Sequence, residues 1–74
     1  MIQDDHDTAR VKQHVHDLMQ SRRFEEASAV VQNTLVREPD NADFLHLLGV
    51  VKDLQGFTAE AIPFIQKAIK LQPD

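Results

Sequence analysis

The sequence predicts an all-α protein of four antiparallel helices, arranged as two helix–turn–helix units that form a short α-solenoid. Three observations favour this fold class. The chain repeats itself with a period of 34 residues, its apolar residues recur at helical spacing, and Gly or Pro stands where several of the helices are expected to end. Such a period is typical of solenoids built from helix pairs, because neighbouring units must stack to bury a continuous core.

The repeat consists of like residues that lie 34 positions apart. The pairs are Val11 and Leu45, Glu26 and Glu60, Ala27 and Ala61, Val31 and Ile65, Leu35 and Ile69, Pro39 and Pro73, and Asp40 and Asp74. This register divides the chain into an acidic N-terminal extension, residues 1–7, a first unit, residues 8–41, and a second unit, residues 42–74.

Two helices are expected in the first unit, over residues 8–21 and 24–37. Asp4 or Asp5 could begin the first of them earlier, since carboxylates are favourable near a helix N-terminus. The short connection between the two stretches makes the helices antiparallel neighbours.

The third helix is expected from Ala42 to Gln55, where apolar residues follow one another at helical spacing. Asp40 and Asn41 are its capping candidates, because their side-chain oxygens can accept a hydrogen bond from the first-turn amides. Gly56 is expected to stop it.

The fourth helix is expected from Thr58, taken as its cap, to about Leu71. It ends there because Pro73 disfavours the helical conformation in the residue before it. Ala27, Ala61 and Gly49 are small, and we expect them where two helices approach closely, since larger side chains would push the helices apart.

Both units resemble tetratricopeptide repeats over residues 8–74, essentially the whole chain. In the second unit the residues that carry the resemblance are Leu45 in the usual Trp position, the pair Leu48 and Gly49, Ala61, Ile65 and Pro73. The first unit keeps Ala27, Val31 and Pro39, has His14 and Val15 in place of the Leu-Gly pair, and has Arg22 where the second unit has Gly56. The resemblance implies a right-handed α-solenoid fragment whose function is to bind proteins.

The resemblance also implies a partner groove lined by the first helix of each unit. The groove residues carried over in this way are Lys12, His16, His46, Val50 and Asp53. We expect a protein or peptide partner and no enzymatic activity, in a module that forms the N-terminal part of a larger protein. The alternative is a free-standing adaptor that self-associates as a homodimer through its C-terminal helix.

That alternative rests on the width of the last helix's apolar surface. At about 100° per residue its apolar side chains span roughly 180°, whereas packing against one core needs little more than 100°. The face predicted to pair with another copy or with a next repeat consists of Ile62, Phe64, Ile65, Ile69 and Leu71.

Composition excludes several other classes of function. The chain has no Cys, so disulfides, thiolate metal sites and Cys nucleophiles are absent. Its net charge of −4 argues against a nucleic-acid partner. We expect no membrane association and a cytoplasmic location, since neither a signal peptide nor an apolar run of spanning length is present.

The four His residues do not predict a metal site. His14 and His16 are two residues apart, which on a helix is about 200° of rotation, so their rings point in opposite directions. We expect His14 to be a partly buried packing residue and His6, His16 and His46 to be solvated. No cofactor is expected, because no Gly-rich phosphate loop or nucleophile motif occurs.

Overall fold

A computed structural model describes residues 3–72 of the chain, and the side chains of residues 8–72. This part folds into four α-helices without a strand, so the all-α prediction is confirmed. In chain order the helices are α1 (Gln3–Gln20), α2 (Phe24–Arg37), α3 (Ala42–Leu54) and α4 (Thr58–Leu71). The side chain of His6, predicted to be solvated, and the repeat positions Pro73 and Asp74 lie outside the part of the chain that the structure describes.

The helix bounds agree with the predicted ones to within one residue, except at the start of α1. α2 and α4 begin and end 34 positions apart, as the repeat requires. α1 begins at Gln3 instead of Thr8 and takes up most of the predicted extension, closer to the earlier start at Asp4 or Asp5. No Gly or Pro occurs between Gln3 and Thr8 to end the helix.

The turns after α1 and α3 have the same hydrogen-bond pattern. In the second turn the Phe57 amide donates to the Lys52 carbonyl at 2.8 Å, and the Gly56 amide donates to the Asp53 carbonyl. In the first turn Arg23 and Arg22 make the equivalent bonds. These two bonds define a Schellman ending, which needs one residue at positive φ. Gly56 fills that position at φ 91°, and Arg22 fills it at φ 62°.

Asn41 caps α3 as predicted, because its side-chain oxygen accepts a hydrogen bond from the Phe44 amide at 3.2 Å. The prediction that Thr58 caps α4 is wrong. The Schellman turn places Phe57 at the capping position, and Phe57 has no side-chain oxygen to offer. The Thr58 hydroxyl instead donates to Asp53 Oδ1 at 2.7 Å.

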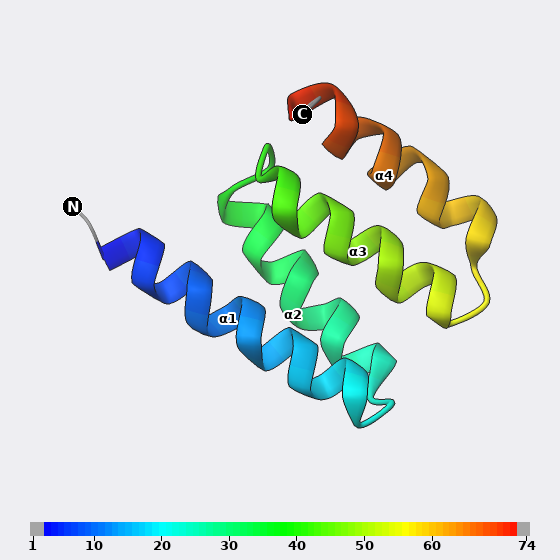
Figure 1. The fold of residues 1–74 in the computed structure, drawn as a ribbon, viewed down its shortest axis with the longest axis horizontal. Coiled ribbons are helices and arrows are strands. Elements are labelled where there is room, and N and C mark those ends of the chain that lie inside the picture. The colour runs from blue at the N-terminus through cyan, green and yellow to red at the C-terminus, as the bar shows by residue number, and fades with distance from the viewer. Residues whose placement is uncertain (1–2, 73–74) are drawn as a thin grey trace.

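α3 lies in the middle of the molecule, with α4 on one side and the α1–α2 pair on the other (Figure 1). Its apolar residues therefore meet side chains from both units. The main core cluster consists of Val15, Leu18, Ala27, Val31, Phe44, Leu47, Leu48 and Val51. A smaller cluster of Ala42, Leu45 and Ala68 continues this core toward α4.

α3 and α4 make the most extensive interhelix contact, and they run side by side in Figure 1. Gly49 permits this approach, because a Cβ there would clash with Ile65 and would lie 3.3 Å from the Ala61 carbonyl oxygen. Ala61 is itself buried, as is Ala27 in the first unit. The expectation of small residues at close helix contacts is confirmed for all three positions.

Candidate functional site

The second unit has a partly exposed apolar stripe along α4, formed by Ile62, Ile65 and Ile69, which we call the isoleucine stripe. Ile62 is 48% exposed and Ile69 is 57% exposed, whereas Ile65 is half-buried beside Gly49. Large aliphatic side chains are usually placed out of water. The stripe is therefore the first candidate for a contact surface.

The repeat shows what this stripe corresponds to in the first unit. The residues 34 positions earlier are Ser28, Val31 and Leu35 of α2. Ser28 is 6% exposed, and Val31 is completely buried in the main core cluster with residues of α3. Leu35 is half-buried against the cluster that contains Ala42 and Leu45 of α3.

Each of the three positions is thus less buried in α4 than in α2. Among residues 3–72, no helix follows α4 to cover the stripe as α3 covers α2. Each of the three positions is therefore more buried in the unit whose second helix has a further helix packed on it.

At the end of the stripe, α3 and α4 enclose a shallow pocket of about 170 Å³. It is lined by Ala42, Asp43, His46, Ala68, Ile69 and Gln72. The pocket brings together His46, predicted as a groove residue, and Ile69, predicted on the C-terminal face. The two predicted surfaces therefore meet here.

The position equivalent to His46 in the first unit is Lys12. Lys12 Nζ lies 3.1 Å from Asp43 Oδ2, so an ion pair joins α1 to the first turn of α3. Both side chains are partly exposed, so this contact contributes modestly to stability. The ion pair nevertheless links the first turn of α3 to α1 of the first unit.

The other predicted groove residues lie on α1 and α3 and are at least partly accessible. His16 and Asp53 are exposed, and Val50 is half-buried. Asp53 accepts the Thr58 hydrogen bond in the α3–α4 turn, and Lys12 is paired with Asp43. The two charged groove residues are thus already engaged within the chain.

The predicted C-terminal face divides into two parts. Phe64 packs against both core clusters and lines a groove of about 470 Å³ between α2 and α4, together with the 81%-exposed Val36. Leu71, seven residues after Phe64, is exposed. Ile62 and Ile69 lie on the other edge of α4, so a single flat contact cannot use all five residues equally.

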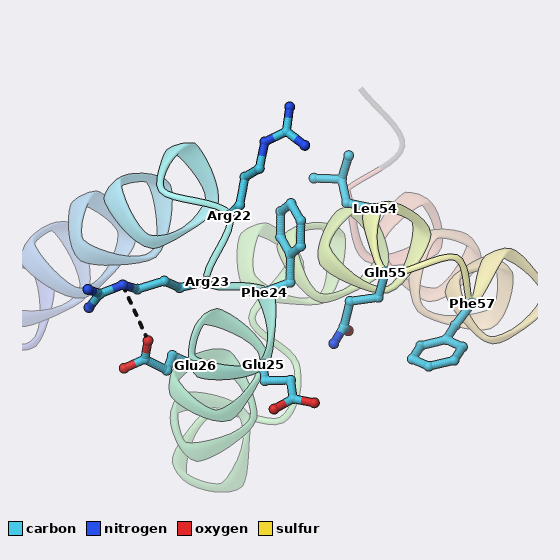
Figure 2. Close-up of a pocket in the computed structure, with 8 residues that line it drawn as sticks. All are labelled: Arg22, Arg23, Phe24, Glu25, Glu26, Leu54, Gln55 and Phe57. Carbon is cyan, nitrogen blue, oxygen red and sulfur yellow. Dashed lines mark ion pairs between the residues drawn. The ribbon is translucent and has the colours of Figure 1, made fainter.

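A further cleft of about 580 Å³ lies between the turn after α1 and the turn after α3 (Figure 2). Phe24, Leu54 and Phe57 supply its apolar surface. Its charges are balanced, with Arg22 and Arg23 against Glu25 and Glu26, and Arg23 Nε lies 3.7 Å from Glu26 Oε1. The sequence interpretation missed this cleft, since its lining comes from two turns far apart in the chain; the available signal was an aromatic residue, Phe24 or Phe57, directly after the end of a first helix.

The outer face of α1 is polar at the positions that are apolar in α3. Phe44, Leu47, Leu48 and Val51 of α3 are buried, and their equivalents in α1, all exposed, are Arg10, Gln13, His14 and Asp17. Gln13 Nε2 donates to Asp17 Oδ1 at 3.1 Å along this face. The expectation of a partly buried His14 is wrong, because nothing among the described residues covers α1 there.

His16 and His46 are exposed, as predicted. Among residues 8–72, whose side chains the structure describes, no three His, Asp or Glu residues are grouped so that they could hold a metal ion. Within residues 3–72, none of the helices combines the length and the apolar composition needed to cross a membrane.

Comparison of the chain with models of protein families, with curated proteins and with solved structures gave no match.

Proposed function

We propose that this chain is a binding module of the tetratricopeptide type, which holds a protein partner on the face formed by α3 and α4 and catalyses no reaction. Three features support the repeat assignment. α2 and α4 are offset by 34 residues at both ends, the two Schellman turns match, and Gly49 and Ala61 lie at the closest helix contact.

The observation that carries the proposed function is the isoleucine stripe. Burying an Ile side chain is worth about 1.5–3 kcal/mol, so Ile62 and Ile69 leave much of this free energy unused in the isolated chain. Exposed apolar surface rimmed by polar residues is typical of protein interaction sites. His46 and Gln72 provide such a polar rim beside Ile69.

Site-specific photo-crosslinking tests this proposal. The protein is prepared with a photoreactive residue at position 69 and is irradiated in an extract of its native cells. It should then form discrete crosslinked products with another protein. The same residue at position 36 is the matched control, since Val36 is exposed and apolar but lies outside the stripe.

The added substitution Ile62→Glu should remove the products formed from position 69, because a carboxylate on the stripe must lose water when a partner covers it. Equal crosslinking from positions 36 and 69, or no crosslinking from position 69, would contradict the proposed function.

Self-association is the second candidate function, and it is favoured by the absence of charge along the stripe. The residues at helical spacing on this side of α4 are Thr58, Ile62, Ile65, Gln66, Ile69 and Gln72. Two copies could pair these surfaces about a two-fold axis without like charges meeting. Sedimentation over a hundredfold concentration range tests the pairing. A dimer that Ile69→Glu converts to a monomer supports it, and a monomer at high micromolar concentration contradicts it.

A further inference from the structure

We draw no further inference here: the strongest candidate, the cleft of about 580 Å³ between the turn after α1 and the turn after α3, has an apolar surface of Phe24, Leu54 and Phe57 between balanced charges, and nothing in the structure shows what covers it.

Discussion

The two units share their helix bounds and their turn geometry, but they differ in how their second helices are covered. α2 is packed against α3, so Val31 is buried and Leu35 is half-buried, whereas no helix among residues 3–72 packs on α4 in the same way, so the equivalent Ile65 is half-buried and Ile69 is exposed. Equivalent residues can therefore serve different purposes. A position that is buried in the core of the first unit is partly or fully exposed in the second.

The first helices of the two units differ in a complementary way. α3 is apolar on both sides because it packs between the α1–α2 pair and α4, and α1 is polar on its outer side. The exposed outer face of α1 is therefore polar, whereas the exposed face of α4 is apolar. Variants at equivalent positions of the two units test this asymmetry.

The largest expected effect comes from truncating the contact residues of α3. Phe44→Ala should destabilise the chain by about 3–5 kcal/mol, because Phe44 is completely buried and the truncation leaves a cavity. Arg10→Ala, at the equivalent position of α1, should change stability by less than about 0.5 kcal/mol. Urea unfolding followed by circular dichroism measures both. Similar effects at the two positions would show that α1 and α3 are not differently covered.

The next effect concerns the close contact of α3 and α4. Gly49→Val introduces the residue found at the equivalent position of the first unit, Val15, and should destabilise the chain by about 1–3 kcal/mol through overpacking against Ile65. Ala29→Val at an exposed position of α2 reports the helix propensity of Val alone. If both variants unfold at the same urea concentration, Gly49 is not needed for the close approach.

The sequence predicted the helices well because their limits are set locally. Asn41 and Gly56 act on residues within one turn, and apolar spacing identifies each stretch. One wrong prediction, the capping role of Thr58, is local, because the Schellman turn moves the capping position to Phe57. The other depends on the other helices, since His14 is exposed because no helix among residues 3–72 covers that side of α1. The cleft between Phe24 and Phe57 arises only when two distant turns meet.

A smaller effect distinguishes the two turns. Arg22→Gly should stabilise the chain by about 0.5–1 kcal/mol, because Arg22 adopts φ 62° in a conformation that Gly adopts without strain. Gly56→Ala should destabilise it by about 1 kcal/mol for the same reason. Thermal unfolding measures both. A loss of stability in Arg22→Gly would mean that the Arg22 side chain makes a contact worth more than the backbone strain.

The smallest effect is expected on the isoleucine stripe. Ile69→Glu should change stability by no more than about 0.5 kcal/mol, since Ile69 is exposed. Leu35→Glu, the equivalent change in α2, should destabilise the chain by about 1–3 kcal/mol because it brings a carboxylate against Ala42 and Leu45. Thermal unfolding at low micromolar protein concentration measures the stability of both variants. Equal losses would show that the stripe already belongs to the folded core.

The central claim is that α4 presents an open face where α2 is covered. Methyl NMR spectra recorded with a soluble paramagnetic probe test it most directly, because relaxation of each methyl group reports its access to solvent. We expect strong relaxation of the Ile62 and Ile69 methyl groups, intermediate relaxation of Leu35 and almost none of Val31. Protection of Ile69 equal to that of Val31 at low protein concentration would contradict the account.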